Sequence, residues 1–426
     1  MSATALAILC ACEQPPAPVA IPTLQATPTS VPPTPTPTST STPLPTPTPL
    51  PFGTGPLHAE GGSLVDAGGR TVRLTGVNWS GMETGGFAPI GLNARNLDAM
   101  LDQIAASGFN TVRLPFSNEL LDSKVKRFNI NFAVNPKLIS LSGLELLDHV
   151  IEAAGRHGLR IILDRHRPVA AGQSDLWYTA EVPEERWIRD WVMLAQRYHG
   201  NRAVIGADLT NEPHGAATWG DNNLATDWRL AAERAGNAIL EANPDWLIIV
   251  EGVEHVGPNT YWWGGNLSGA LDAPVRLSRP ERLVYSPHDY GPRESGQSWF
   301  QDARFPDNLP DLWLNRWAYL QKQGIAPVLV GEFGGPSVGG DPEGIWQRAL
   351  VRYLEDGGFS YTYWVWNPDA WIGGLVLDDR GTLDRAKIDM LRRSQAPMLG
   401  SADPTPTPTP LPDAPGTSQA ARRSSV

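Results

Sequence analysis

Short apolar runs alternate with longer amphipathic segments along most of the chain. The runs are rich in Val, Ile, Leu and aromatic residues, a composition typical of buried β-strands. Eight strands are predicted in this way, at residues 72–79, 111–116, 160–166, 204–211, 246–252, 283–290, 327–332 and 361–366.

The segments between most of these strands carry apolar residues at helical spacing. Residues 141–157 show the pattern well, with apolar side chains at Leu144, Leu147, Val150, Ile151 and Ala154. Helices are predicted at residues 94–107, 141–157, 187–198, 227–242, 311–323 and 344–356. Most of them run into a glycine, such as Gly108, which accepts the left-handed conformation that ends a helix.

The alternation of strand and helix determines the fold class that we predict. Repeated β-α units make a parallel sheet, and a sheet of eight such strands closes most readily into an α/β barrel of the (β/α)8, or TIM, type. The alternative is an open, doubly wound sheet. It is weakened because no glycine-rich phosphate loop follows the first strand.

Composition separates the barrel from its flanks. Pro and Thr dominate residues 14–53, and a second Pro/Thr tract runs from Asp403 to Pro412. Proline removes backbone donors, and few large apolar side chains are present, so both segments are expected to be disordered and extended. We therefore divide the chain into a partial signal or lipobox at 1–13, a linker at 14–53, the barrel at 54–400 and a tail at 401–426.

The first residues indicate export. Residues 3–12 are small and apolar, like the end of a secretory signal, and residues 9–12 resemble a bacterial lipobox with Cys12 as the lipidated residue. No basic segment precedes them, so a start further upstream and a chance match both stay open. The expected location is extracellular or anchored at the bacterial cell surface.

Cysteine content and charge narrow the function classes. The two cysteines, Cys10 and Cys12, lie in this first segment, so the barrel has neither disulfides nor a thiolate metal site. The formal net charge of −11 argues against nucleic acid as a partner. All 16 tryptophans lie between Trp79 and Trp371, a content that suits either a large core or a sugar-binding cleft.

Two glutamates carry the chemical prediction. Glu212 and Glu332 each follow a buried run, where a carboxylate is costly unless it is paired or functional. In a barrel the carboxyl ends of the strands meet at one face, which holds the chemistry. Paired carboxylates are the catalytic groups of most enzymes that cleave glycosidic bonds. Any single polar residue at a strand end could instead be structural.

Six motifs resemble glycoside hydrolase family 5, a family of retaining enzymes on a (β/α)8 barrel. They lie at residues 110–115, 161–168, 211–214, 286–290, 331–334 and 363–368. Residues 227–238 and 261–267 further resemble bacterial endoglucanases of subfamily 1. The resemblance implies a secreted endo-β-1,4-glucanase, a cellulase, that acts on β-glucan.

The resemblance also implies catalytic roles. Glu212 would be the acid/base and Glu332 the nucleophile, with their carboxyl groups about 5 Å apart, as retention requires. Arg113 would orient Glu332 and Tyr290 would donate a hydrogen bond to it. His288 would contact the acid/base.

Further residues would hold the sugar. Asn211 would bind the 2-hydroxyl and His166 the 3-hydroxyl of the sugar in subsite −1, above a floor formed by Trp364. Other candidate substrate contacts are Trp263, Gln297, Asn78 and Trp366. Trp366 is equally assignable to the core.

The remaining expectations concern cofactors and alternatives. Asp164, His166 and His288 are residue types that bind metals, but the retaining mechanism implied by the resemblance needs neither metal nor cofactor. A monomer is expected. The alternatives are another β-glycanase on the same fold (a mannanase, a mixed-linkage glucanase or a xyloglucanase) and, more distantly, a non-catalytic carbohydrate-binding barrel.

Overall fold

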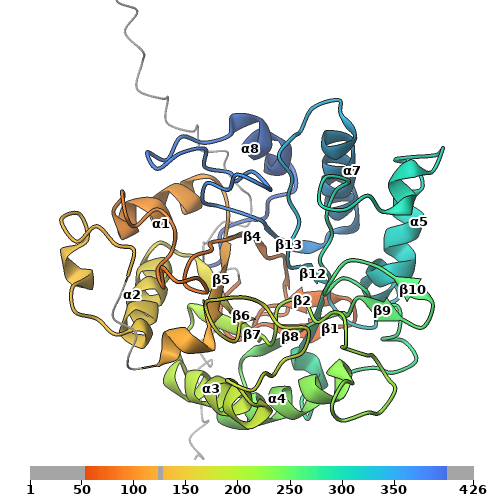
Figure 1. Ribbon diagram of the computed structural model, residues 1–426, viewed down its shortest axis with the longest axis horizontal. Coiled ribbons are helices and arrows are strands. Elements are labelled where there is room, and N and C mark those ends of the chain that lie inside the picture. The colour runs from red at the N-terminus through yellow and green to blue at the C-terminus, as the bar shows by residue number, and fades with distance from the viewer. Residues whose placement is uncertain (1–52, 123–127, 401–426) are drawn as a thin grey trace, which may run out of the picture. The chain divides into compact units, whose positions relative to one another are not determined.

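The eight predicted strands are confirmed, and they form one parallel sheet (Figure 1). The computed structural model describes residues 53–122 and 128–400. The strands are β4 (Thr75–Asn78), β5 (Thr111–Ser117), β6 (Arg160–Arg167), β7 (Val204–Asp208), β8 (Leu247–Glu251), β11 (Leu283–Ser286), β12 (Leu329–Val330) and β13 (Ser360–Tyr363). Outside the described residues lie the predicted signal or lipobox with Cys12, all of the predicted linker at 14–53 except Gly53, and the tail at 401–426.

The sheet closes on itself. The strand order is β11-β8-β7-β6-β5-β4-β13-β12, and the two end strands meet through backbone hydrogen bonds. The Tyr285 N–H donates to Pro327 O at 3.1 Å, and the Gly331 N–H donates to Pro287 O at 3.1 Å. The predicted (β/α)8 barrel is therefore confirmed, and the open doubly wound alternative is wrong.

Helices surround this barrel (Figure 1). They are α1 (Leu97–Ala106), α2 (Gly143–Arg156), α3 (Glu184–Arg197), α4 (Trp228–Ala242), α5 (Leu309–Trp313), α6 (Tyr319–Lys322), α7 (Pro342–Gly357) and α8 (Arg385–Arg392). A π-helical segment, Leu314–Ala318, joins α5 to α6, so the helix predicted at 311–323 contains a bulge. The short helix α8 was not predicted.

Local signals explain where the helices begin and end. At the start of α2, Ser142 Oγ accepts from the Glu145 N–H at 3.3 Å, and the Glu145 carboxylate accepts from the Ser142 N–H at 2.6 Å. Gly108 and Gly158, after α1 and α2, have φ angles of 91° and 75°, in the left-handed region that glycine tolerates.

The first predicted strand, at 72–79, is wrong in its extent. Its first residue belongs to β3 (Thr71–Val72), which pairs with β2 (Ser63–Val65). β2 in turn pairs with β1 (His58–Glu60), and the three form a small antiparallel sheet. The barrel strand β4 begins only at Thr75. Both pieces are apolar, and the hydrophobic pattern contains no signal for the break between them.

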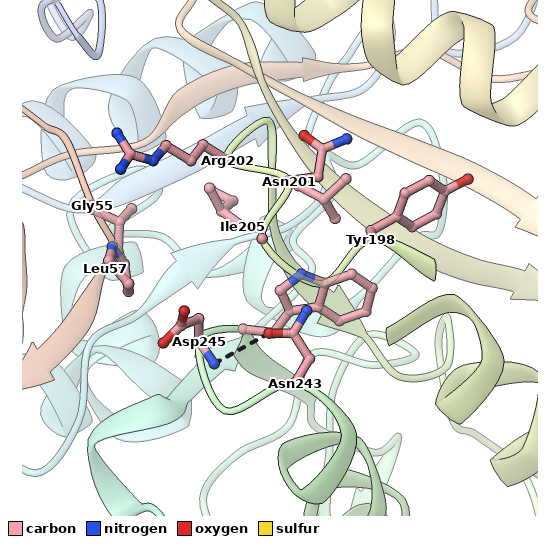
Figure 2. Close-up of a pocket in the computed structure, with 12 residues that line it drawn as sticks. Gly55, Leu57, Tyr198, Asn201, Arg202, Ile205, Asn243 and Asp245 are labelled. Carbon is pink, nitrogen blue, oxygen red and sulfur yellow. Dashed lines mark hydrogen bonds between the residues drawn. The ribbon is translucent and has the colours of Figure 1, made fainter. Parts of the chain in front are cut away.

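The small sheet covers the N-terminal end of the barrel. There an apolar cluster joins it to the strands, and its members are Leu57, Leu64, Val72, Leu74, Ile162, Ile205, Leu247, Ile249, Val284, Leu329 and Leu399. A pocket of about 250 Å³ opens at this end. Figure 2 shows Tyr198, Asn201 and Arg202 along one edge of it and Asn243 and Asp245 along the other. None of these residues belongs to the predicted site.

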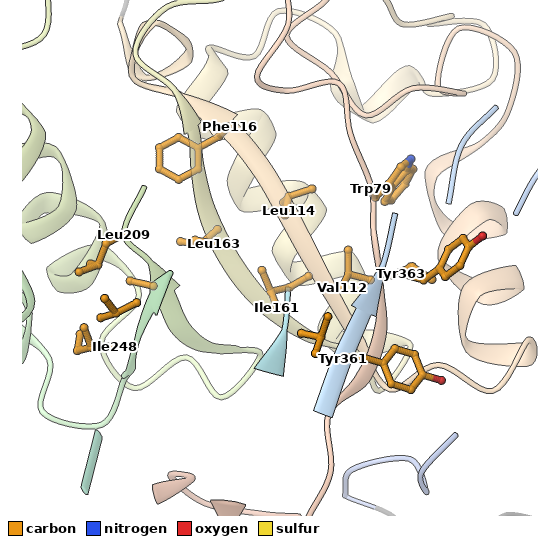
Figure 3. Packing of buried hydrophobic residues seen from close by; sticks show 14 of the residues in the cluster. Trp79, Val112, Leu114, Phe116, Ile161, Leu163, Leu209, Ile248, Tyr361 and Tyr363 are labelled. Atoms are coloured by element: carbon orange, nitrogen blue, oxygen red, sulfur yellow. The ribbon is translucent and has the colours of Figure 1, made fainter. Parts of the chain in front are cut away.

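The outer wall of the barrel packs against the helices. Figure 3 shows Val112, Leu114 and Phe116 of β5 beside Ile161 and Leu163 of β6. They occupy alternate positions, as the two-residue period of a strand requires for one face. The intervening residues of each strand therefore point into the barrel.

One connection departs from the β-α repeat. Between β8 and β11, residues 252–282 form a hairpin of β9 (His255–Val256) and β10 (Asn259–Thr260) and a 3₁₀ turn at Pro280–Arg282, without an α-helix. Further 3₁₀ turns lie at Asn118–Leu121, Pro136–Leu138 and Ser298–Gln301. No helix among the described residues is both long and apolar enough to cross a bilayer.

Candidate active site

A buried arginine lies at the centre of the C-terminal half of the barrel. Arg113 of β5 contacts carboxylates from four other elements and is fully buried. Its nitrogens lie 2.8 Å from Asp208, 3.0 Å from Asp164, 3.0 Å from Glu251 and 2.6 Å from Glu332. Burial lowers the pKa of Arg113, but the four carboxylates outweigh it and raise the pKa well above its usual value.

One arginine does not neutralise four carboxylates. Burial raises the pKa of Asp164 to about 6, against the attraction of Arg113. Burial likewise raises the pKa of Asp208 and of Glu251, and the negative charge of Asp208 adds to the rise at Glu251. The layer around Arg113 therefore holds a proton more readily than exposed carboxylates do.

Glu332 follows β12 and faces this layer. Its side chain is only 4% exposed, and its Oε1 lies 2.6 Å from Arg113 Nη1. Its Oε2 accepts a hydrogen bond from the Tyr290 hydroxyl at 2.7 Å. The structure thus places Arg113 and Tyr290 against Glu332, as the sequence predicted.

Glu212 follows β7 in a strained backbone conformation. Its φ angle is 50°, in the left-handed region that non-glycine residues rarely adopt. Its Oε1 lies 3.0 Å from His288 Nδ1, and its Oε2 accepts from Gln173 Nε2 at 3.0 Å. Burial raises the pKa of Glu212, but the hydrogen bonds from His288 and Gln173 and the charge of His288 outweigh it, so the pKa is lowered.

The two glutamates face each other across a short gap. One carboxylate oxygen of Glu212, one of Glu332 and a ring nitrogen of His288 all lie within 4.8 Å of one another. This spacing suits the separation of about 5 Å found in retaining pairs, and it is well short of the roughly 9 Å found in inverting ones.

His288 forms a charged bridge between the carboxylates. Its Nδ1 lies 3.0 Å from Glu212 Oε1 and 3.7 Å from Glu332 Oε2, and its Nε2 lies 3.3 Å from Glu251 Oε1. Burial lowers its pKa, but Glu251, Glu332 and Glu212 outweigh burial and raise the pKa well above its usual range. The ring is therefore protonated at neutral pH.

His166 is held differently. Its ring stacks on Trp364 with centroids 5.3 Å apart, and its Nδ1 lies 2.7 Å from Asp164 Oδ2. Burial lowers the pKa of His166 to about 4 despite the nearby charge of Glu332, so the ring is neutral at neutral pH. The neutral ring, with Nδ1 held by Asp164, leaves Nε2 to contact a ligand.

A cleft of about 450 Å³ opens above these groups. Seven of the predicted site residues line it: Glu212, Glu332, His166, Tyr290, Trp364, Trp263 and Gln297. Trp263 is 45% exposed and stacks on His214, with centroids 3.7 Å apart. Predicted residues from the ends of five strands, β6, β7, β11, β12 and β13, thus meet in one cleft with two loop residues, Trp263 and Gln297.

Asn211 lies next to the cleft, against Arg113. Its Oδ1 accepts from Arg113 Nη2 at 3.1 Å. Its Nδ2 is buried and has no hydrogen-bond partner among the described residues. A buried donor without a partner is costly, which suits a group that meets a ligand hydroxyl.

The predicted substrate contact of Asn78 is wrong, and of the two alternatives for Trp366 the structure supports the core. Asn78 is fully buried and donates to Gly331 O at 3.0 Å and to Thr362 O at 3.1 Å, while its Oδ1 accepts from Arg113. It ties neighbouring strands to Arg113 and does not reach the cleft. Trp366 is also fully buried and packs edge-on against Phe109, so it belongs to the core.

Three residues of the site were missed by the sequence analysis. Gln173 and Trp371 lie in loops, where strand-end reasoning gives no signal. Glu251 ends β8, and it carried the same signal as Glu212 and Glu332, a carboxylate at the end of a buried run. That signal alone predicts a buried carboxylate at the end of the fifth strand, but none of the six family motifs includes Glu251.

Trp371 is the most exposed aromatic residue of the cleft. It is 57% exposed, its Nε1 donates to Glu294 Oε2 at 2.6 Å, and the Arg293 guanidinium lies 5.4 Å from its ring centroid. An exposed indole that is fixed in this way is a preformed surface for stacking.

Two groups in the described residues have the spacing of metal ligands. They are Asp164 with His166 and Glu332, and Glu212 with His288 and Glu332. Arg113 already engages Asp164 Oδ2 and Glu332 Oε1, and Tyr290 engages Glu332 Oε2. Both oxygens of Glu332, the carboxylate common to the two groups, are thus already paired with protein donors, whereas Asp164 Oδ1 has no hydrogen-bond partner among the described residues.

Comparison with known proteins gives one consistent family. Residues 65–370 match the family described as cellulase (glycosyl hydrolase family 5). An endoglucanase of Paenibacillus polymyxa is 53% identical over 353 residues, which cover 82% of this chain and 89% of that protein. The major extracellular endoglucanase of Xanthomonas campestris pv. campestris is 42% identical over 336 residues, or 77% of this chain and 69% of that protein.

Solved structures agree. The catalytic domain of the Xanthomonas campestris enzyme aligns with a TM-score of 0.75 at 40% identity, covering 79% of this chain and 99% of that one. A complex of the Pyrococcus horikoshii endocellulase with cellotetraose aligns with a TM-score of 0.76 at 38% identity, covering 81% and 99%.

Proposed function

The chain belongs to glycosyl hydrolase family 5, the cellulase family, and from this premise we propose that it is an endo-β-1,4-glucanase. It hydrolyses internal β-1,4-glucosidic bonds with retention of configuration at the anomeric carbon. The observation that carries the proposal is the pair of carboxylates, Glu212 and Glu332, whose oxygens approach within 4.8 Å at the barrel mouth.

The reaction has two steps. In the first, a carboxylate oxygen of Glu332 attacks the anomeric carbon while Glu212 donates its proton to the leaving glycosidic oxygen, which gives a glycosyl-enzyme ester. In the second, Glu212 removes a proton from water as the water attacks the same carbon, and Glu332 leaves as a carboxylate. Each step inverts the carbon, so the product keeps the β configuration.

The surrounding groups suit these roles. Arg113 and Tyr290 aim Glu332 by holding one carboxylate oxygen each, at 2.6 and 2.7 Å. Protonated His288 donates to Glu212 and stabilises its carboxylate after the proton has left. Because His288 also lowers the pKa of Glu212, the proton-donating form is most populated under acidic conditions.

Polar and aromatic groups bind the sugar. His166 and Asn211 contact hydroxyls of the sugar in subsite −1, supported by the free Nε2 of His166 and the unpaired Nδ2 of Asn211. Trp364 is the floor of that subsite. Trp263 and Trp371, both exposed in the cleft, stack on more distant sugars, and Gln297 lies near enough to bind their hydroxyls.

We also propose that the enzyme acts outside the cell, free or held at the surface through a lipid on Cys12. The apolar start and lipobox-like residues 9–12 support this location. A Cys12→Ser variant that still incorporates labelled palmitate as the parent does would contradict the anchor.

The substrate class is tested on soluble polysaccharides. We expect release of reducing sugar from carboxymethyl-cellulose and little from mannan, xyloglucan or mixed-linkage glucan. Release from mannan without release from carboxymethyl-cellulose would replace the glucanase with a mannanase. Full activity of a Glu332→Ala variant would remove the proposed nucleophile, and no hydrolysis by the parent enzyme would favour a binding barrel.

A further inference from the structure

A third carboxylate lies directly behind Glu212 and has no part in the two-step reaction. Glu251 ends β8 and is completely buried. Its Oε2 accepts a hydrogen bond from the backbone N–H of Glu212 at 2.7 Å. Its Oε1 accepts from Arg113 Nη2 at 3.0 Å and lies 3.3 Å from His288 Nε2. One side chain thus touches the acid/base, its charged neighbour and the central arginine.

The contact with Glu212 bears on its strained backbone. A φ angle of 50° is unfavourable for a residue with a Cβ, so surrounding contacts must hold it. The bond from the Glu212 N–H to Glu251 Oε2, at 2.7 Å, fixes this backbone against the end of β8. Loss of this bond would release the backbone that aims the Glu212 carboxyl.

The next loop is shaped to leave room for Glu251. Gly264 has a φ angle of 64°, and a Cβ added there would lie 2.2 Å from Glu251 Oε2 and 3.1 Å from Glu212 Cα. The Gly252 N–H donates to Gly264 O at 2.7 Å, which holds this loop against the end of β8. Trp263 precedes Gly264, so the same packing sets the position of a sugar-binding surface.

The charges around Glu251 come from every neighbouring strand. Positive charge is supplied by Arg113 from β5 and by His288 after β11. Negative charge is supplied by Asp164, Asp208, Glu212 and Glu332, which surround the same arginine and histidine. Glu251 and Glu212 approach opposite nitrogens of the His288 ring: Glu251 lies near Nε2, and Glu212 lies near Nδ1.

We propose that Glu251 is a positioning residue of the reaction, which fixes the backbone of Glu212 and holds a charged His288 against its carboxyl. The inference rests on the proposed function, since it presupposes that Glu212 is the acid/base. Glu251 itself contacts neither the substrate nor the reacting atoms. It acts through Glu212, which transfers the proton, and through His288, which adjoins Glu212.

Asp208 offers a matched control. It is equally buried, contacts the same arginine at 2.8 Å and is also a carboxyl group whose pKa is raised by burial. Among the described residues, the Asp208 carboxyl forms its hydrogen bond with Arg113, whereas Glu251 also contacts Glu212 and His288. Glu251→Gln and Asp208→Asn therefore make the same change from carboxyl to amide, but only the first makes it next to the acid/base.

The first readout is the pH profile of kcat/KM for cellotetraose, whose alkaline limb reports loss of the acid proton. Without the charge of Glu251, the pKa of His288 falls, less positive charge faces Glu212, and burial raises the pKa of Glu212. In Glu251→Gln we expect the alkaline limb to move upward by about 1 pH unit, and in Asp208→Asn by less than about 0.3 unit. Equal movement in both variants, or none in Glu251→Gln, would overturn the inference.

The second readout separates positioning from general damage. A 2,4-dinitrophenyl β-cellobioside has a leaving group that needs no proton, so its kcat/KM is insensitive to the acid. For Glu251→Gln we expect a loss of about 10- to 100-fold on cellotetraose and less than about 3-fold on the activated substrate. Equal losses on the two substrates would indicate a structural role only.

Two further variants keep the test decisive. If Glu251→Gln does not fold, Glu251→Asp retains the charge at greater distance and should move the alkaline limb upward by a smaller amount; an unmoved limb contradicts the inference. Glu212→Gln tests the premise separately. If Glu212→Gln keeps full activity on cellotetraose, the proposed function fails; if it loses activity while Glu251→Gln behaves like Asp208→Asn, only this inference fails.

Discussion

The two ends of the barrel are built from the same strands but from opposite chemistry. On β6, Ile162 belongs to the apolar cluster at the N-terminal end, and Asp164, two residues later, binds Arg113. On β8, Ile249 and Glu251 repeat the pattern, again two residues apart. Because a strand has a period of two, both members of each pair point into the barrel.

This difference shows how one framework serves stability and catalysis. At the N-terminal end, burial of apolar side chains stabilises the fold by about 25 cal/mol for each Å² removed from water. At the mouth, buried charges are held close together, and each is costly unless its partners are in place. We therefore expect substitutions at the first end to change stability and substitutions at the second to change activity.

The largest effect is expected for Glu332→Ala at the mouth. Loss of the nucleophile should lower kcat on cellotetraose by about 10⁴-fold or more. Stability should change little or rise, because one of four carboxylates around Arg113 is removed. Steady-state rates and thermal melts measure both. A melting temperature that collapses together with the activity would break the contrast between the two ends.

Leu329→Ala tests the opposite end of the barrel. Leu329 lies in β12, three residues before Glu332, and faces the N-terminal end. Leu329 is fully buried in the apolar cluster, so its truncation should cost about 2–5 kcal/mol of unfolding free energy. The kcat of the folded enzyme, measured well below the melting temperature, should stay within about 3-fold of the parent. Denaturant unfolding gives the stability, and a large loss of kcat at unchanged stability would contradict the account.

The charge layer should itself depend on pH. The pKa of Asp164 is raised to about 6 in the folded state, above its usual value near 3.9, so folding favours its protonated form. Its contribution to stability is therefore present below about pH 4 and is lost as the pH rises through 6, a change of up to about 3 kcal/mol. The Asp164→Asn variant should gain stability relative to the parent over this range, and a constant difference from pH 4 to pH 7 would refute the assignment.

The smallest expected effect is at the rim of the cleft. Trp371→Ala removes an exposed stacking surface, so KM for cellotetraose should rise by about 10-fold, with unfolding free energy unchanged. Leu377 is also highly exposed, at 58%, and Leu377→Ala is the control. Equal KM values for the two variants would show that Trp371 does not contact the substrate.

Much of this architecture was predictable from the sequence because the strand ends carry their own signal. Buried runs located the strands, and the residues that follow them, such as Glu212 and Glu332, converge as a closed barrel requires. Glu251 carries the same signal, because it also ends a buried strand, although no family motif includes it.

The predictions that the sequence could not make concern residues beyond the ends of strands, where the backbone is no longer regular. Trp364 and Trp366 are two apart, and the sequence offers both as substrate contacts, with Trp366 equally assignable to the core. β13 ends at Tyr363, and beyond it the two-residue alternation no longer holds. The Trp366 ring therefore lies in the core beside Phe109, while Trp364 faces the cleft. The contacts that fix Trp371 join two loops, which periodicity does not describe.

The central claim is that Glu212 and Glu332 form a retaining pair at the mouth of the barrel. The most direct test is to follow the anomeric protons of the products by NMR during hydrolysis of cellotetraose, before mutarotation. We predict that the β-anomer appears first and the α-anomer only later. An initial α-anomer would mean inversion and would contradict the roles of both glutamates.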